Sequence, residues 1–434
     1  MIDYTEPLQI MNRSLIVSKL KNYVKSKNLI SNQRDLEKYN KDWRGFYNFN
    51  SICAIFPETV EEIQKILIFC NNNNIKIVPQ AGNTSLTGAS VPSQHDHEVI
   101  LNINKMNKII EIDKNNLSVT TEAGVCLDDV KDYADKNNFY FPISLSSSGS
   151  CLIGGNIATN AGGINALKYG SMRDNVIGIE VVLADGSLIN SMSSMKKNNT
   201  GYDLKNIFCG SEGTLGIITE VHLRLSPIPE SIMSAVCQFT DLESAVLSAQ
   251  EIIQYGVPIA RIEMLNKDQM EISIKYSKLE NAEPLPTLFF EFHGSESSNK
   301  ESIKIVEELS KNNGGSDFKW AESTEDRNKL WKARHEIYYA VKAQGTNVKI
   351  YATDICVPIS NLVECIKFSE KEIQQYGLKA PMVGHVGDGN FHVTVIYDPA
   401  KKGEYEIIRN FSDKLIDKAL ELEGTITGEH GIGL

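Results

Sequence analysis

The sequence lacks several features that would assign a functional class directly. It has no apolar run near the roughly 20 residues of a membrane-spanning helix, and its first residues lack the basic and apolar regions of a signal peptide. Its 8 cysteines include no C-x-x-C pair, which favours reduced thiols over a disulfide framework. Acidic residues outnumber basic ones, 55 to 44, and no basic stripe is available for nucleic acid. We therefore expect a cytoplasmic protein without nucleic-acid partners.

The 434 residues, 41% of them hydrophobic, are enough for two or three packed domains. Pro227 and Pro229 mark the best boundary, because proline cannot extend a ladder of strand hydrogen bonds. We therefore predict a first domain over 1–228 and a second over 229–434.

Hydrophobic periodicity predicts mixed helices and strands in both domains. In the first domain, a capping box begins a helix over 59–70, and Asp185-Gly186 is typical of a hairpin turn. The other predicted elements of this domain are strands over 75–78, 117–121, 178–183 and 217–225. In the second domain, the pattern predicts helices over 241–255 and 301–311 and strands over 287–292 and 393–397, an α+β pattern.

Three segments of the first domain are rich in glycine and small polar residues: PQAGNTSLTG (79–88), SSSGSCLIGGNIATNAGG (146–163) and GSEGTLG (210–216). The first offers backbone N–H groups and two hydroxyls to a phosphate, although a plain surface turn is the alternative. The second carries buried-type apolar residues, which flexible linkers rarely do, so we expect its backbone to lie close to a large flat ligand. Glycines of the third mark a bulge or another close approach. Together the three segments predict a dinucleotide held in extended form.

These segments, with FPETVEEI (56–63), resemble the flavin domain of the vanillyl-alcohol oxidase family. Within that family, almost the whole chain is similar to the D-lactate and D-2-hydroxyglutarate dehydrogenases and the glycolate oxidase flavoprotein subunit. The resemblance implies an α+β fold, with a two-subdomain FAD-binding domain of the PCMH type followed by an α+β cap, or substrate, domain of the FAD-linked oxidase C-terminal type. Because family chains continue past the position of Leu434, we also expect a truncated C-terminal tail.

The resemblance also implies which residues bind FAD. Residues of the first segment would contact the pyrophosphate, and residues of the second would contact the flavin and the ribityl chain. Glu212 and Ile218 would lie near the adenosine. The implied residues are Ala81, Gly82, Asn83, Thr84, Ser85, Gly88, Gly149, Ser150, Gly154, Gly155, Thr159, Asn160, Gly163, Glu212 and Ile218. Some family members bind FAD covalently through a histidine of the first segment. This segment has none, so we expect non-covalent FAD.

The stretch GHVGDGNFH (384–392) places His385 and His392 on either side of a turn sequence, so that both can face one point. Near the end of the chain, Glu429 offers a carboxylate. Two histidines and a carboxylate suit Zn²⁺, Mn²⁺ or Fe²⁺ with open positions for a substrate. The alternative is an ordinary turn with one buried and one exposed histidine. In the resembled family these three residues correspond to the ligands of a divalent metal, zinc or manganese, and His430 corresponds to the general base.

Positive charge for an acid substrate is found in LWKARHE (330–336) and VKIYATD (348–354). The arginine segment resembles that of the family, so Arg334 would bind a carboxylate bidentately and Lys349 would add a point charge. Tyr338, one turn after Arg334, would line the same pocket. The alternative for both cations is a solvated surface.

These features predict an FAD-dependent dehydrogenase that oxidises a small D-2-hydroxy acid, D-lactate or a close relative, with electrons passing to a quinone, a cytochrome or an electron-transfer flavoprotein. WKARHE (331–336) is similar to D-lactate dehydrogenases, whereas NTGYDL (199–204) is similar to D-2-hydroxyglutarate dehydrogenases. Thr394 stands where the latter often carry Asn, which favours the smaller acid. Two other classes stay open, a non-catalytic flavin-binding subunit and a metal-dependent hydrolase without flavin. Peripheral membrane association and a homodimer also stay open.

Overall fold

The computed structural model describes residues 11–94, 97–195, 197–279 and 282–434. Contacts divide the chain into two compact units. Unit 1 comprises Met1–Gly163, Ser171–Ile228 and His430–Leu434, and unit 2 comprises Ile164–Gly170 and Pro229–Glu429. The units differ from the predicted uninterrupted domains because two short segments pack with the other unit. Among the described residues, no helix combines the length and the apolar character needed to cross a bilayer.

Among its described residues, unit 1 contains a four-stranded sheet, a five-stranded sheet and a two-stranded sheet of β7 (Phe139–Tyr140) and β11 (Ser226–Pro227). In the first, with strand order β1-β2-β4-β3, the last three strands are parallel. Thr59 caps helix α3 by accepting a hydrogen bond from the N–H of Glu62, and the helix and strand predicted over 59–70 and 75–78 are confirmed. The elements of this part are α1 (Arg13–Leu20), β1 (Leu29–Ile30), α2 (Gln33–Asn40), β2 (Ala54–Ile55), α3 (Val60–Asn72), β3 (Lys76–Gln80) and β4 (Glu98–Asn102).

The second sheet of unit 1 is antiparallel, with the order β5-β6-β10-β8-β9. Strands β6, β8 and β10 confirm the remaining three strands predicted in the first domain, and Gly186, at φ 83°, makes the predicted turn between β8 and β9. The elements are β5 (Ile109–Asp113), β6 (Ser118–Glu122), α4 (Leu127–Lys136), β7 (Phe139–Tyr140), α5 (Ile153–Ala158), α7 (Met172–Asn175), β8 (Val176–Val182), β9 (Leu188–Asn190), α8 (Lys205–Phe208), β10 (Ile217–Arg224) and β11 (Ser226–Pro227).

The second glycine-rich segment is not a loop throughout, because it contains the short helix α5. A Cβ atom added to Gly154 would lie 2.9 Å from the Cβ of Ala123, and one added to Gly155 would lie 2.9 Å from the Cβ of Ala81. The two glycines therefore let the helix pack closely against its neighbours. Glycine has a low helix propensity, which is why the sequence pattern alone predicted a loop.

Unit 2 is built on one antiparallel sheet with the order β15-β12-β14-β13-β18-β19-β16, and β17 also pairs with β19. The predicted helices and strands of this part are confirmed, and helix α11 begins earlier than expected. The elements are α6 (Ala166–Tyr169), β12 (Ser231–Phe239), α9 (Leu242–Gln254), β13 (Arg261–Leu265), α10 (Lys267–Ser277), β14 (Thr287–Gly294), α11 (Glu296–Asn312), β15 (Gly315–Ala321), α12 (Thr324–His335), α13 (Ile337–Lys342), β16 (Lys349–Ala352), β17 (Ile355–Cys356), α14 (Leu362–Tyr376), β18 (Met382–His385), β19 (Asn390–Tyr397) and α15 (Glu404–Glu421).

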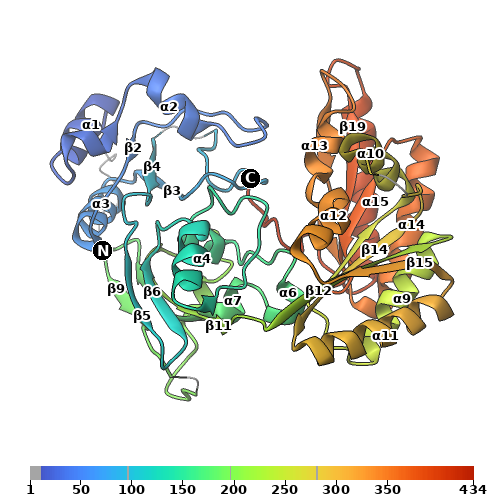
Figure 1. Cartoon of the computed structure of the whole chain (residues 1–434). Coiled ribbons are helices and arrows are strands. Elements are labelled where there is room, and N and C mark those ends of the chain that lie inside the picture. Colours follow the sequence, from blue (N-terminus) through green and yellow to red (C-terminus); the bar gives the residue numbers. More distant parts are fainter. Residues whose placement is uncertain (1–10, 95–96, 196, 280–281) are drawn as a thin grey trace. The chain divides into compact units, whose positions relative to one another are not determined.

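Helices cover both faces of this sheet (Figure 1). Apolar side chains of α9, α11, α14 and α15 pack on one face with Phe290 and Phe292, whereas those of α10, α12 and α13 pack on the other with Phe289 and Val383. Side chains alternate along a strand, so polar residues two positions from Phe289 and Val383 share the α12 face with them. That face carries the candidate site.

Candidate active site

The β18–β19 hairpin brings His385 and His392 together. In its antiparallel register, His392 lies opposite Val383, and the turn at 386–389 separates the two strands. The imidazole ring centroids are 5.6 Å apart. The Nε2 atoms of His385 and His392 lie 3.4 and 3.3 Å from the same oxygen, Oε1 of Glu429. The structure therefore brings the three residues predicted as metal ligands to one point.

The other ring nitrogen of each histidine is also engaged. Nδ1 of His385 lies 2.6 Å from Oε1 of Glu263, and Nδ1 of His392 lies 3.1 Å from the backbone oxygen of Thr353. Because both partners are acceptors, each Nδ1 donates its N–H. In the neutral imidazoles this leaves the lone pair on Nε2, the atom that faces Glu429.

Asp354 holds the segment that carries Glu429. Its Oδ2 accepts hydrogen bonds from the hydroxyl of Thr427 at 2.6 Å and from the backbone N–H of Glu429 at 2.9 Å. Its Oδ1 lies 3.4 Å from Nδ1 of His392 and accepts a hydrogen bond from the amide of Asn390 at 3.1 Å. Asp354 was not among the predicted site residues. A single acidic residue after a short strand carries no signal of its own.

The donor set fits a divalent metal. Two neutral imidazoles and a carboxylate are ordinary ligands of zinc and manganese, and two ligands of a tetrahedral zinc ion lie about 3.4 Å apart. Each Nε2–Oε1 distance, 3.4 and 3.3 Å, has this value. In addition, the ligand atoms of Asp354, His392 and Glu429 lie within 4.8 Å of one another. Hydrogen-bonded partners behind each histidine are also typical of metal sites.

Electrostatics within this cluster favour charged carboxylates. Burial lowers the pKa of His385, but the carboxylates of Glu263 and Glu429 outweigh it and raise that pKa well above its ordinary value. Burial raises the pKa of Glu429, but His385 and His392 hold it well below its usual range. Without a cation, a protonated His385 lies between the two carboxylates, and the guanidinium of Arg334 balances the second negative charge. A divalent ion would take the place of that proton.

The predicted substrate-binding arginine belongs to the same network. Arg334 lies in the last turn of α12, and its Nε and Nη2 atoms both lie 2.7 Å from Oε2 of Glu263, whose Oε1 holds His385. Lys349 is half-buried and begins β16, which pairs with β19, and Tyr338 follows in α13. The carboxylate-binding roles of Arg334, Lys349 and Tyr338 stay predictions.

His430, the predicted base, follows Glu429 and begins the segment that packs with unit 1. In this segment, the N–H groups of Ile432 and Gly433 donate to the carboxylate of Glu212 at 2.7 and 2.9 Å. The Glu212 carboxylate thus binds the C-terminal segment. Its predicted position near the adenosine stays a prediction.

The first two glycine-rich segments of unit 1 lie against each other. A Cβ atom at Gly82 would lie 2.2 Å from the backbone oxygen of Ser150, so only glycine fits there. Asn83, at φ 52°, donates its amide to the oxygen of Lys41 at 2.9 Å and accepts the Ser90 hydroxyl at 2.8 Å. The contact of Gly82 with Ser150 brings predicted pyrophosphate and flavin residues side by side.

The remaining predicted FAD residues lie in these segments, except Ile218, which lies in β10. The Thr159 hydroxyl donates to the oxygen of Gly155 at 3.1 Å, and Oδ1 of Asn160 accepts the N–H of Arg173 at 2.9 Å. Asn160 at φ 49° and Gly163 at φ 76° adopt left-handed backbone. The others lie in the 81–88 turn, before α5 and in β10: Ala81, Thr84, Ser85, Gly88, Gly149 and Ile218.

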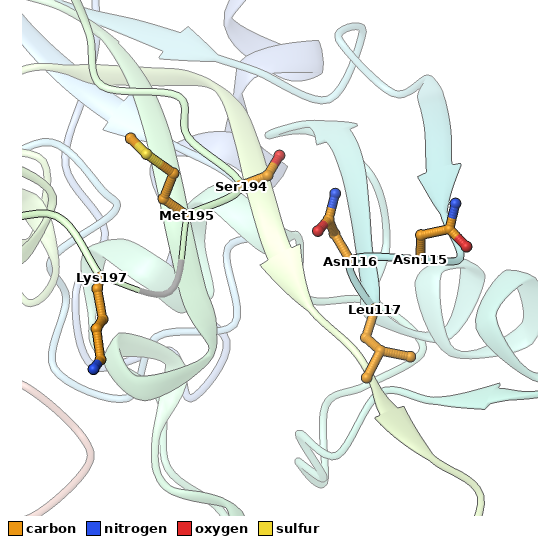
Figure 2. A pocket seen from close by; sticks show the side chains of 6 residues that line it. All are labelled: Asn115, Asn116, Leu117, Ser194, Met195 and Lys197. Atoms are coloured by element: carbon orange, nitrogen blue, oxygen red, sulfur yellow. The ribbon is translucent and has the colours of Figure 1, made fainter.

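A surface depression elsewhere on unit 1 contains none of these residues. Figure 2 shows its lining, formed by the turn between β5 and β6 and by the segment after β9: Asn115, Asn116, Leu117, Ser194, Met195 and Lys197. The lining has no carboxylate, histidine or thiol, so we assign it no chemistry.

Comparison with known proteins identifies the family. Residues 52–191 match the FAD binding domain, and residues 228–434 match the C-terminal domain of FAD linked oxidases. A probable mitochondrial D-lactate dehydrogenase of Danio rerio is 42% identical, over 88% of this chain and 76% of that protein. The chain belongs to the FAD-linked oxidases. A probable mitochondrial D-2-hydroxyglutarate dehydrogenase of Oryza sativa subsp. japonica is 31% identical to this FAD-linked oxidase, over 96% of the chain and 75% of that protein.

Solved structures confirm the fold class. p-Cresol methylhydroxylase with substrate bound has a TM-score of 0.78 and 19% identity, over 98% of this chain and 91% of that one. At this identity the likeness concerns the fold alone. The prediction of an FAD-binding domain followed by an FAD-linked oxidase C-terminal domain is confirmed, and so is the prediction of an FAD-dependent oxidoreductase.

Proposed function

We propose that this FAD-linked oxidase is a dehydrogenase that oxidises a small D-2-hydroxy acid, D-lactate above all, to the 2-oxo acid. The observation that carries the proposal is the convergence of His385 and His392 on Glu429, beside an arginine bound to the same carboxylate as His385. A 2-hydroxy acid presents a hydroxyl and a carboxylate on adjacent carbons. A metal and a guanidinium are suited to bind these two groups.

Different residues of the site would bind the metal and the substrate. His385, His392 and Glu429 would hold a zinc or manganese ion, which when bound supplies a Lewis acid for the substrate hydroxyl. Arg334 would bind the substrate carboxylate through the N–H groups that Glu263 does not use, and Lys349 would add positive charge. The acid would then be oriented by two groups that recognise different parts of it.

His430 would act as the general base. A neutral imidazole accepts the hydroxyl proton as the C2–H bond breaks and the C2–O bond becomes a carbonyl, and the two electrons of the C2–H bond leave as hydride. FAD, bound non-covalently, supplies the acceptor for that hydride. An external acceptor, namely a quinone, a cytochrome or an electron-transfer flavoprotein, would then reoxidise the enzyme.

D-2-hydroxyglutarate and glycolate are the alternative substrates. D-2-hydroxyglutarate carries a second carboxylate, which needs a further donor. Thr394 is buried in β19, two positions after His392 and on the same face of the sheet, and offers one hydroxyl there. The higher identity to the protein named for D-lactate, 42% against 31%, also supports the smaller acid.

An anaerobic visible spectrum tests the proposal. The FAD-loaded protein, with its metal content assayed, is mixed in turn with D-lactate, L-lactate, D-2-hydroxyglutarate and glycolate. We expect D-lactate alone to bleach the flavin band near ~450 nm. Bleaching only by another acid would reassign the substrate. A yellow protein that no acid bleaches would indicate a non-catalytic flavin-binding subunit, and a colourless protein that hydrolyses esters would revive the metal-dependent hydrolase.

Two histidine variants supply the matched control for this experiment. His392→Ala should keep the yellow colour but lose the metal and the bleaching, because one of three ligands is gone. His293→Ala removes another buried histidine of the same unit, which lies on β14. It should keep metal, colour and bleaching. Equal metal content in wild type and His392→Ala would contradict the assigned ligand.

A further inference from the structure

Two buried glutamates on the α12 face of the sheet each contact one arginine and one histidine. Glu263 in β13 contacts Arg334 and His385, at 2.7 and 2.6 Å. Glu291 in β14 contacts Arg261 and His293, at 3.0 and 2.8 Å. Each carboxylate therefore joins one guanidinium to one imidazole. Only the first pair belongs to the candidate active site.

The geometry around Glu263 separates its two oxygens. Oε2 accepts from Nε and Nη2 of Arg334, and Oε1 accepts from Nδ1 of His385. The Glu263 side chain is 2% exposed, so the pairing is shielded from water, and that of Arg334 is 16% exposed. A guanidinium has five N–H donors, and this pairing uses two of them along one edge.

We propose that Glu263 is a positioning residue that couples the metal ligand to the substrate-binding arginine. The inference rests on the proposed function, because it requires His385 to bind a metal and Arg334 to bind the substrate carboxylate. Accepting the Nδ1–H bond directs the Nε2 lone pair of His385 toward Glu429. Accepting from Arg334 fixes the plane of the guanidinium. One buried side chain thus sets the orientation of both groups.

The substitution Glu263→Gln breaks this arrangement with little change of shape. A carboxylate accepts on both oxygens, whereas a primary amide accepts on one atom and donates from the other. In one orientation the amide NH₂ faces the Nδ1–H of His385, and in the other it faces the guanidinium of Arg334. Either way, one donor of the pair loses its acceptor.

Two dissociation constants test the coupling in the FAD-loaded full chain. The first is that of Zn²⁺, measured after metal removal by competition with a chromophoric chelator. The second is that of pyruvate for the oxidised, zinc-loaded enzyme, measured from the flavin difference spectrum. We expect Glu263→Gln to weaken zinc binding by about 10- to 100-fold, the usual effect of removing a partner of a ligating histidine. We expect the pyruvate dissociation constant to rise as well.

Glu291→Gln is the matched control, because it removes the same charge from the same face of the sheet. It should lower the melting temperature as Glu263→Gln does. Both dissociation constants should stay within about twofold of wild type, because residues that do not contact a site usually change its binding free energy little. If both variants lower only the melting temperature, Glu263 is structural and the inference fails while the proposed function stands. If wild type binds neither zinc nor manganese, the metal part of the proposed function fails and the coupling fails with it.

Glu263→Asp covers the case in which the glutamine variant does not fold. Aspartate keeps the charge but is shorter by one methylene, so it cannot reach both partners. We expect it to weaken zinc or pyruvate binding, and wild-type values for both would overturn the proposal.

Discussion

The carboxylate of Glu212 accepts a hydrogen bond from the backbone N–H of Gly433, at 2.9 Å and across 221 positions of the chain. The neighbouring N–H of Ile432 donates to the same carboxylate at 2.7 Å. Gly431 and Gly433 have φ values of 88° and 67°, backbone conformations that favour glycine. The segment that follows Glu429 and His430 is therefore bound by this acidic side chain of unit 1, and the N–H of Leu434 also donates to the backbone oxygen of Thr87 at 3.0 Å.

Glu212→Gln should loosen this segment, because an amide accepts only one of the two N–H bonds. We expect faster hydrogen exchange at 430–434 and flavin reduction by D-lactate slower by about 10- to 100-fold, since a small misplacement of His430 is costly. The affinity for FAD separates this role from the predicted adenosine contact of Glu212, because loosening of the segment alone would leave that affinity at the wild-type value. Glu111→Gln, at an exposed position of β5, is the control. Weaker FAD binding with unchanged exchange would instead support the predicted adenosine contact of Glu212.

Much of the fold could be predicted because its signals are local. The capping residue Thr59 and the apolar spacing after it define α3, and Asp185-Gly186 defines a turn. The sequence pattern did not predict helix α5, because its glycines allow close packing against Ala81 and Ala123, and these contacts depend on the tertiary structure. The attachment of Ile164–Gly170 to unit 2 was missed for the same reason, since it depends on contacts such as that of Asn165 with Arg261.

The residues of the candidate site also differ in whether the sequence predicts them. His385 and His392 could be predicted because a single hairpin carries both, and its turn residues are visible in the sequence. Glu263 and Asp354 could not, because each acts through contacts with residues far along the chain, 122 positions away for Glu263 and His385 and 73 for Asp354 and Thr427. Strand register determines these contacts, and isolated acidic residues do not encode it.

His293 should make stability depend on pH. Burial lowers its pKa, and the positive charges of Arg261 and Lys168 add to this against the opposing effect of Glu291. The hydroxyl of Tyr169 lies 2.8 Å from its Nδ1. Because the pKa is lower in the folded state, the unfolded chain binds more protons below about pH 6.5, so stability is lost as the pH falls.

The measurement is the free energy of unfolding between pH 7.5 and 5.5 for wild type and His293→Asn. The wild-type slope should be steeper by up to about 1.4 kcal/mol per pH unit, the value for one proton. Equal slopes in wild type and His293→Asn would show that His293 does not titrate on unfolding.

Arg334→Ala should chiefly raise the KM for D-lactate, by about 10- to 100-fold, because a charge-assisted contact with the substrate carboxylate is lost. The melting temperature should also fall, because Glu263 is left buried without its guanidinium partner. Lys329→Ala removes an exposed positive charge from the same helix and should change neither quantity much. Steady-state kinetics with metal-saturated, FAD-loaded protein make the comparison, and an unchanged KM would exclude Arg334 as the carboxylate-binding residue.

Substitutions at Gly149 and Gly82 should distinguish an effect on FAD binding from an effect on folding. A Cβ atom at Gly149 would have its nearest neighbour at 3.4 Å, a side-chain oxygen of Asp128, whereas one at Gly82 would lie 2.2 Å from the backbone oxygen of Ser150. Gly149→Ala should therefore leave the melting temperature of the FAD-free protein unchanged, yet weaken FAD binding by about tenfold, because the methyl group fills space needed by the flavin. Gly82→Ala should lower that melting temperature before any FAD is added, because backbone must move. Titration of the FAD-free variants with FAD measures both effects, and wild-type FAD affinity in Gly149→Ala would remove Gly149 from the binding site.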